Sequence, residues 1–420
     1  MFKFLIKNEQ RALFLLFFIA LILRAVFVWY QYANKGMEGW NDALYYIHLG
    51  KQIAEGNWNP EGYGGRVGMF VAPVVPLIVA FFVKLFTEPV IPFLIFNVIA
   101  TSFMVPVLYY LGKEVFNRNT AWLLAIWGGF FFWSFWYSRI VLKEALIFLL
   151  IPLTLLFVMR SLRPENQLKN LFFGAFYFSV LIHTDERYLI YGPFILLIFL
   201  CIKPFRFVSY LKVSLIFTAL ILIFMIPWGI HNYQKYGQIV IITARTTTFT
   251  SALWGKNLYI EVHKPSRKQK SEEPSEDRPK RAQAFAEEND IVLKKYSKTE
   301  ARINAFIHLW RPVLLKPVFI SDGLKPEKWN PKTNIINVLS YGVFLPFYLL
   351  GFFLLLKRKH YSGLLLAIIP VLHNTFQAYL FSSLLRYRLP IYFIIAMIGI
   401  WVMLELVKKT NFKHYFKNLS

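Results

Sequence analysis

The chain has 420 residues, of which 57% are hydrophobic and 19% aromatic, and its formal net charge at pH 7 is +24. Repeated apolar runs of about 17–25 residues can each span a bilayer, which excludes an ordinary water-soluble domain. Lys and Arg gather in the short loops between these runs, so the positive charge indicates orientation in a membrane and contact with membrane lipids, with no nucleic-acid partner. The single cysteine, Cys201, excludes a disulfide framework and a cysteine-based metal site within one chain. The sequence predicts an all-α, polytopic transmembrane helical bundle.

The first apolar run, residues 13–32, predicts a retained membrane helix with its basic N-terminal flank in the cytoplasm. Residues 33–70 are then expected outside. Within them, residues 42–55 predict a short amphipathic helix with Asn41 as its cap. Its apolar stripe is expected to consist of Ala43, Tyr46, Ile47, Gly50 and Ile53. Asp42 is expected at or above the membrane surface because a bare carboxylate in hydrocarbon is costly; the alternative is an ordinary solvated loop.

The next apolar run, residues 71–86, decides the topology of everything that follows. Pro73 and Pro76 open it, Lys84 interrupts it, and it is short for a membrane span. If this run crossed the membrane, the basic loop at 112–119 and the later basic loops would lie outside. We therefore predict a juxtamembrane helix at the outer surface, with the loop 112–119 in the cytoplasm.

Nine further membrane helices are expected after this helix, which gives about ten spans. They are predicted at 91–111, 120–137, 145–160, 170–183, 188–202, 210–229, 335–356, 361–381 and 391–407. The chain then divides into three parts: a catalytic transmembrane module at 1–229, with its first outer loop at 33–90; a long, partly flexible outer loop at 230–334; and C-terminal membrane helices with a basic cytoplasmic tail at 335–420.

Ionisable groups in or near apolar runs are costly, so their placement is informative. The predicted topology puts nearly all of them at the outer face, with Arg24 as the main exception. The candidate site residues are Asp42, Tyr45, Tyr46, His48, Arg66, Arg139, Lys143, Glu144, Asp185, Arg187, Arg386 and Arg388. Carboxylates and several cations at one membrane surface suit chemistry on an anionic lipid head group. No spacing supports a particular metal site, so metal ligands stay unknown.

Several of these residues could instead have simpler structural roles. Arg139, Lys143 and the two arginines near the last helix could be interfacial anchors, because long basic side chains commonly extend from helix ends to the interface. Glu144 could pair with Arg139 or Lys143. The turn that holds Asp185 and Arg187 could neutralise its own charge. The three-dimensional arrangement of these groups decides between these alternatives.

Five motifs occur in a fixed order along the chain. They are Asp42 with Tyr45-Tyr46, a Pro-rich juxtamembrane stretch, Ser138-Arg139 with Lys143-Glu144, Pro227-Trp228 with His231-Asn232-Tyr233, and Arg386-Tyr387-Arg388-Leu389-Pro390. Together they resemble the GT-C superfamily of polyprenyl-phosphate-sugar glycosyltransferases, in the protein-mannosyltransferase and aminoarabinose-transferase-like branch (glycosyltransferase family 39 and its bacterial relatives). The chain departs from many of these relatives in having His231-Asn232 where they have an Arg-Asn pair.

The resemblance implies a membrane enzyme that moves a sugar from a polyprenyl-phosphate donor to a glycan, lipid or protein acceptor, with inversion at the anomeric carbon. It implies that Asp42 is the base and that Glu144 orients the acceptor or pairs with a cation or metal near the phosphate. Arg386, Arg388, Arg139 and Lys143 would hold the donor phosphate. A divalent metal is possible, and the expected location is a bacterial plasma membrane with the site facing outside. The alternatives are a flippase or transporter of lipid-linked sugars, or an accessory subunit with a degenerate site.

Overall fold

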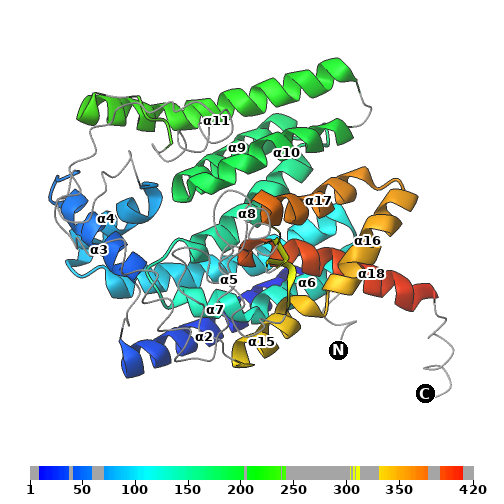
Figure 1. Cartoon of the computed structure of the whole chain (residues 1–420), viewed down its shortest axis with the longest axis horizontal. Coiled ribbons are helices and arrows are strands. Elements are labelled where there is room, and N and C mark those ends of the chain that lie inside the picture. The colour runs from blue at the N-terminus through cyan, green and yellow to red at the C-terminus, as the bar shows by residue number, and fades with distance from the viewer. Residues whose placement is uncertain are drawn as a thin grey trace.

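The computed structural model describes residues 9–36, 41–58, 71–202, 206–237, 239–242, 303, 306–307, 309–312, 331–376 and 388–409. These residues form helices and contain no β-strand, in agreement with the predicted all-α class. The long helices run roughly side by side, and two short helices lie together at one end of the bundle (Figure 1). Those two are Asn41–Ala54 (α3) and Val74–Phe86 (α4).

Five helical segments in the described chain are long and apolar enough to cross a membrane, so the chain is an integral membrane protein. They are Glu9–Lys35 (α2), Val90–Val115 (α5), Phe207–Lys235 within Phe207–Tyr236 (α11), Asn334–Lys357 and Leu389–Lys408. The last two contain Leu345–Lys357 (α16) and Tyr392–Lys409 (α18). The predicted count of about ten spans is not confirmed by the described residues.

The other helices are shorter and complete the bundle. They are Arg118–Phe130 (α6), Phe132–Ser138 (α7), Glu144–Arg160 (α8), Gln167–Thr184 (α9), Tyr191–Ile198 (α10), Pro331–Asn337 (α15) and Tyr361–Phe376 (α17). The helix predicted at 120–137 is divided because Phe131 is extended, with ψ at 105°. The helix predicted at 335–356 contains a π-helical turn, Val338–Gly342. The helix predicted at 188–202 has a 3-10 turn at each end, Glu186–Ile190 and Phe199–Cys201.

The segment that contains α3 and α4 forms the two short helices that its pattern predicts. On α3, Ala43, Ile47 and Ile53 are buried, and α3 packs against α4. The 13 residues of α4 extend about 20 Å at 1.5 Å per residue, which is short for a hydrocarbon core of about 30 Å. The dimensions of α4 therefore suit the predicted juxtamembrane position.

Ion pairs at the opposite end of the bundle support the same topology. Glu9, at the start of α2, pairs with Lys113 at 2.6 Å and with Arg118 at 3.0 Å. The start of α2 and the loop 112–119 therefore lie at one end, so the chain between them makes an even number of crossings. Since α2 and α5 supply two crossings, α4 need not cross.

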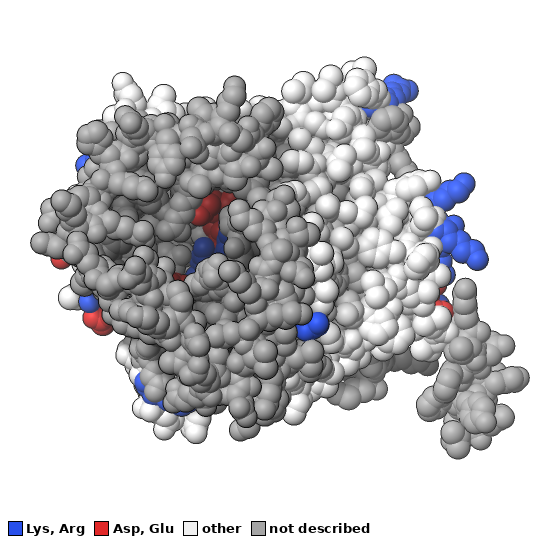
Figure 2. Space-filling view, in the orientation of Figure 1, with Lys and Arg blue, Asp and Glu red and all other residues white. Residues whose placement is uncertain are grey.

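Charged side chains are distributed unevenly over the surface. Where described residues are visible in Figure 2, they form a broad surface without charge, with Lys and Arg at the end where α18 finishes. Acidic and basic side chains occur together toward the end that carries α3 and α4. Such an uncharged band between two charged ends matches a bilayer with water on both sides.

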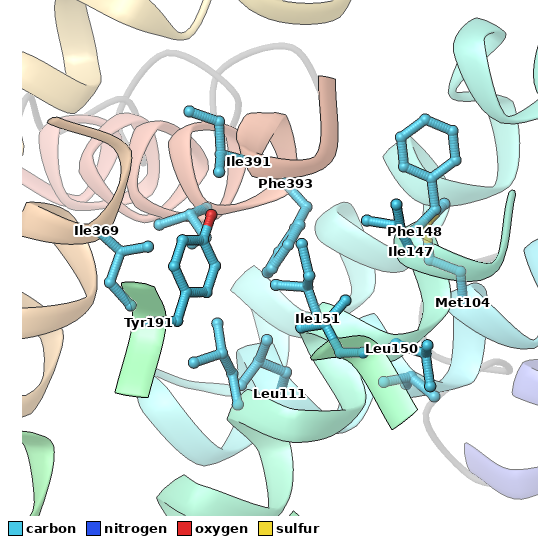
Figure 3. Close-up of a cluster of buried hydrophobic side chains, with 14 of the residues drawn as sticks. Met104, Leu111, Ile147, Phe148, Leu150, Ile151, Tyr191, Ile369, Ile391 and Phe393 are labelled. Carbon is cyan, nitrogen blue, oxygen red and sulfur yellow. The ribbon is translucent and has the colours of Figure 1, made fainter. Parts of the chain in front are cut away.

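The core lies where α5, α8, α10, α17 and α18 meet (Figure 3). It is built from aliphatic and aromatic side chains, among them Leu111, Ile151, Tyr191, Ile369 and Phe393. Burial of each large side chain contributes about 1.5–3 kcal/mol in water, whereas among lipid-facing helices close packing supplies more of the gain. This core holds α8 and the start of α18 in fixed positions.

Arg24 is a fully buried charge inside α2. Its Nη2 donates to the carbonyl of Gly128 at 2.8 Å and to Ser134 Oγ at 2.7 Å, and its guanidinium lies over the ring of Phe135 at 4.6 Å. Gly128 and Ser134 flank the break at Phe131. Since the last carbonyls of a helix lack intrahelical donors, Arg24 stabilises the end of α6 and thereby the direction of α7.

Gly50 allows α3 and α4 to pack closely together. A Cβ atom at this position would lie 2.3 Å from Val79 Cγ1 and 2.5 Å from Val79 Cβ. We expect Gly50→Ala to lower the free energy of unfolding by about 1–3 kcal/mol, because the helices must separate. The measurement is thermal unfolding of the purified protein in detergent. Gly192→Ala is the control, because a Cβ there meets Phe178 at an ordinary 3.8 Å; equal stability of the two variants would contradict the prediction.

Candidate active site

Two polar contacts from α5 hold the loop between α7 and α8. Asn97 Nδ2 donates to the carbonyl of Ile140 at 2.8 Å, and Thr101 Oγ1 lies 2.8 Å from Ser138 Oγ. Asn97 and Thr101 are four residues apart, so they share one face of α5. This loop carries Arg139 and Lys143 directly before Glu144, the first residue of α8.

Asp185 is the centre of a buried ion cluster. Its side chain is fully buried; Lys143 Nζ lies 2.9 Å from Oδ2, Arg187 Nε donates to Oδ1 at 2.8 Å, and Arg187 Nη2 also contacts Oδ2. Burial alone would raise the pKa of the Asp185 carboxyl, but the charges and hydrogen bonds of Arg187 and Lys143 hold it well below its usual range. The sequence suggests that Arg187 alone could neutralise Asp185 within the turn. In the structure Lys143, from another loop, also neutralises Asp185.

Tyr46 connects α3 to this cluster. Burial raises the pKa of its hydroxyl to about 12; the positive charge of Lys143 lowers it, and the carboxylates of Glu144, Asp185 and Asp42 raise it. The Tyr46 hydroxyl therefore lies in the electric field of all four charged groups. Asp42 is exposed in the first turn of α3, and it is four residues from Tyr46, on the same helix face. The Tyr46 hydroxyl is therefore within electrostatic range of Asp42, Lys143, Glu144 and Asp185.

The carboxylate of Glu144 is buried. It forms no ion pair with any residue that the structure describes. Its side chain is 3% exposed, and its Oε2 has no hydrogen-bond partner among those residues. Pairing with Lys143 was one alternative, but Lys143 pairs with Asp185 instead. The N-terminus of α8 stabilises the negative charge because its dipole is positive at that end. A buried carboxylate with an unused acceptor is suited to bind a hydroxyl, a proton or a cation.

The remaining predicted residues lie in different environments. Arg139 is half-buried, with its guanidinium 3.9 Å from the centre of the Trp136 ring. Tyr45 and His48 are half-buried on α3. Arg66 and Arg386 lie outside the described residues.

Arg388 is buried, with 1% exposure. Its Nη1 donates to the carbonyls of Leu309, at 3.2 Å, and Arg311, at 2.6 Å, and its guanidinium also contacts the rings of Tyr341 and Tyr392. Arg388 therefore connects the start of the last helix to the chain near residue 310. The two-arginine phosphate fork stays a prediction.

Sequence reasoning missed the roles of Asn97 and Thr101. A signal for them exists: two hydrogen-bonding side chains four residues apart inside an apolar helix indicate contacts to a neighbouring helix or loop. The pairing of Lys143 with Asp185 had no such signal, because it joins residues 42 positions apart in different loops.

Comparison with known proteins connects this geometry to a family. Residues 71–231 match the model of the dolichyl-phosphate-mannose-protein mannosyltransferase family. That range includes the loop before α8, Glu144, Asp185 and Arg187. No curated protein sequence matches the chain.

Solved structures of the Archaeoglobus fulgidus oligosaccharyltransferase share the fold. The apo form matches with a TM-score of 0.52 at 13% identity, covering 97% of this chain and 51% of that one. The complex of the enzyme AglB with an inhibitory peptide and a dolichol-phosphate matches with 0.52 at 14% identity, covering 98% and 52%. The complex with Zn and sulfate matches with 0.54 at 13% identity, covering 97% and 50%. The chain thus spans about half the length of these proteins. The predicted resemblance is confirmed: residues 71–231 have the sequence pattern of the dolichyl-phosphate-mannose-protein mannosyltransferases, and the chain shares the fold of the archaeal oligosaccharyltransferase.

Proposed function

We propose that the chain is a membrane glycosyltransferase that moves a sugar from a polyprenyl-phosphate donor to a glycan, lipid or protein acceptor. The observation that carries this proposal is the unpartnered Oε2 of buried Glu144, beside the cluster of Lys143, Asp185 and Arg187, inside the segment that matches the mannosyltransferase family. Burying a carboxylate without a counter-charge lowers the stability of the fold. Its presence here therefore favours a functional role for Glu144.

In the proposed reaction an acceptor hydroxyl attacks the anomeric carbon opposite the phosphate. A new carbon–oxygen bond forms, the bond from the anomeric carbon to the phosphate oxygen breaks, and the phosphate leaves with the electron pair. The hydroxyl proton passes to Asp42, and the configuration inverts. Phosphate is a good leaving group, so stabilisation of its charge matters more than protonation.

The cations near the site would provide that stabilisation. We assign the donor phosphate to Arg139 and Lys143 and, from the turn before the last helix, to Arg386 and Arg388. Arg139 is half-buried at the edge of the loop, whereas Lys143 also holds Asp185 in place. Glu144 would accept a hydrogen bond from the acceptor through Oε2 and so orient it for attack.

A metal has no defined place in this scheme. The described residues contain no group of three metal-ligating side chains, and Asp185 already binds two cationic groups. If a divalent metal does bind, Glu144 is the carboxylate with a free acceptor in this part of the structure. No step of the proposed reaction passes through a metal.

The proposed orientation places α3, α4 and the site outside a bacterial plasma membrane, with the ion pairs of Glu9 inside. Residues 1–229 would form the catalytic module, 230–334 an outer loop, and 335–420 the closing helices. The placement of Lys and Arg supports this orientation.

A flippase of lipid-linked sugars is the second candidate function. It would require charged groups along a path through the bundle. Arg24 is buried in the described membrane helices, but it contacts Gly128, Ser134 and Phe135, which suits a structural role.

Release of polyprenyl phosphate separates the two functions, and Glu144→Gln tests the proposed site. We expect the substitution to lower sugar transfer about 10²–10³-fold, because an amide cannot provide the same anionic acceptor in the transition state. The measurement is release of polyprenyl phosphate from a radiolabelled polyprenyl-phosphate sugar in proteoliposomes. The control is Glu165→Gln, which removes a carboxylate at the other end of the bundle. Lipid translocation by the wild-type protein without any release of polyprenyl phosphate would favour the flippase.

A further inference from the structure

A cavity of about 800 Å³ lies at the end of the bundle opposite α3 and α4. It is formed where α5 and α8 end and α9 begins, and its lining includes Glu114, Arg160, Arg163, Lys169, Phe157 and Phe173. Glu114 is next to Lys113, which pairs with Glu9 at the start of α2. The cavity is therefore at the other end of the molecule from the candidate active site.

The charges in this cavity do not cancel. Arg163 Nη2 pairs with Glu114 Oε1 at 2.6 Å, so these two groups neutralise each other. Arg160 and Lys169 form no ion pair within the described chain, and Glu165 is the other carboxylate in the lining. The cavity thus keeps an excess of positive charge.

Arg160 is held in place without being neutralised. Its guanidinium lies 5.5 Å from the ring centre of Tyr110 and 5.8 Å from that of Phe157. Stacking on two rings fixes the direction of the planar guanidinium and leaves its N–H groups available for an anion.

An exposed apolar stripe runs along α9 away from this cavity. Leu168, Phe172 and Phe176 recur every four residues and are 64%, 44% and 39% exposed. Phe173, next to Phe172, is in the wall of the cavity. A molecule with a charged head and an apolar tail could therefore put its head in the cavity and its tail along the stripe.

We propose that this cavity is a binding site for one anionic glycerophospholipid of the cytoplasmic leaflet. Its phosphate would contact Arg160 and Lys169, and its acyl chains would lie along Leu168 and Phe172. Such lipids carry negative charge at the membrane surface, where each nearby basic residue adds to the attraction. This site does not depend on glycosyl transfer, because it uses other residues at the other end of the molecule.

The test is lipid binding to the purified full-length chain, measured by native mass spectrometry in detergent with added phosphatidylglycerol or phosphatidylcholine. We expect one phosphatidylglycerol to bind preferentially and the double variant Arg160→Gln/Lys169→Gln to weaken its binding about tenfold or more. Lys212→Gln/Lys357→Gln removes the same charge at exposed positions outside the cavity and should bind like the wild type. Equal weakening by both double variants would overturn the site.

Two further measurements distinguish a bound lipid from a soluble anion. Lys169→Gln alone alters an exposed side chain and should fold normally, yet weaken phosphatidylglycerol binding. Leu168→Gln should also weaken it, since the apolar contact is reduced without a change of charge. If millimolar inorganic phosphate displaces the lipid, or Leu168→Gln has no effect, the cavity is a site for soluble anions and the lipid assignment is wrong.

Discussion

Asp42→Asn is expected to lower sugar transfer by about 10²–10⁴-fold while donor binding stays nearly unchanged. The amide keeps the shape of the side chain but cannot accept the proton that the acceptor hydroxyl loses. Asp42 is exposed in the first turn of α3, one helical turn before Tyr46, whose hydroxyl lies in the field of Glu144 and Asp185. In the proposed reaction this base takes the proton of an acceptor hydroxyl that Glu144 orients. The measurement is the initial rate of transfer from a radiolabelled polyprenyl-phosphate sugar in proteoliposomes.

Glu55→Gln is the matched control for this substitution. Glu55 directly follows α3 and contacts Gln52, so the change also removes one carboxylate from the same part of the chain. We expect its rate to stay within about twofold of the wild type, as for a surface position away from the chemistry. If Asp42→Asn retained a near-normal rate, Asp42 would be only a structural residue of α3, and Glu144 would become the leading candidate for the base.

The parts of the fold that follow from local patterns could be predicted from the sequence. The stripe of Ala43, Ile47 and Ile53 defines the buried face of α3 because these residues recur at helical spacing. The apolar run at 71–86 likewise predicts the short apolar helix Val74–Phe86, whereas the position of this helix at the membrane surface stays a prediction. Both signals lie within a short stretch of chain.

The parts that depend on contacts between distant segments could not be predicted. Arg24 bridges the division of the helix at 120–137 through contacts with Gly128 and Ser134, which join residues more than 100 positions apart. Similarly, Glu144 and Lys143 are neighbours with opposite charge, and only the position of Asp185 shows which carboxylate Lys143 binds. The sequence indicated which residues could form the site, whereas their pairing depends on packing.

Asp185→Asn is expected to lower the free energy of unfolding by about 3–5 kcal/mol. The substitution removes the negative charge between two cations whose side chains are 19% and 11% exposed, Lys143 and Arg187. Those cations would then lose the buried negative charge that Asp185 provides, which costs more than the loss of a surface ion pair. The measurement is thermal unfolding in detergent, with Glu186→Gln as the control because its half-buried carboxylate forms no ion pair among the described residues.

A double variant tests whether the loss of stability arises from removing the negative charge beside Lys143 and Arg187. Lys143→Met added to Asp185→Asn removes one of the two positive charges that Asp185 had paired with, so the double variant should be more stable than the sum of the single effects predicts. Purely additive effects would show that Asp185 and Lys143 do not interact, and the cluster would then have no role in holding the loop before α8.

The pH dependence of the same variant gives an independent check with a definite sign. The pKa of Asp185 is lower in the folded protein than its ordinary value because Arg187 and Lys143 outweigh the effect of burial. A lowered folded-state pKa contributes stability that is fully present above the unfolded pKa of about 4 and is lost as the pH falls toward the folded value. The stability difference between wild type and Asp185→Asn should therefore be constant from about pH 5 to pH 8 and shrink below about pH 4. A difference that grew on acidification would mean that Asp185 is protonated in the folded protein, and the ion cluster would have to be abandoned.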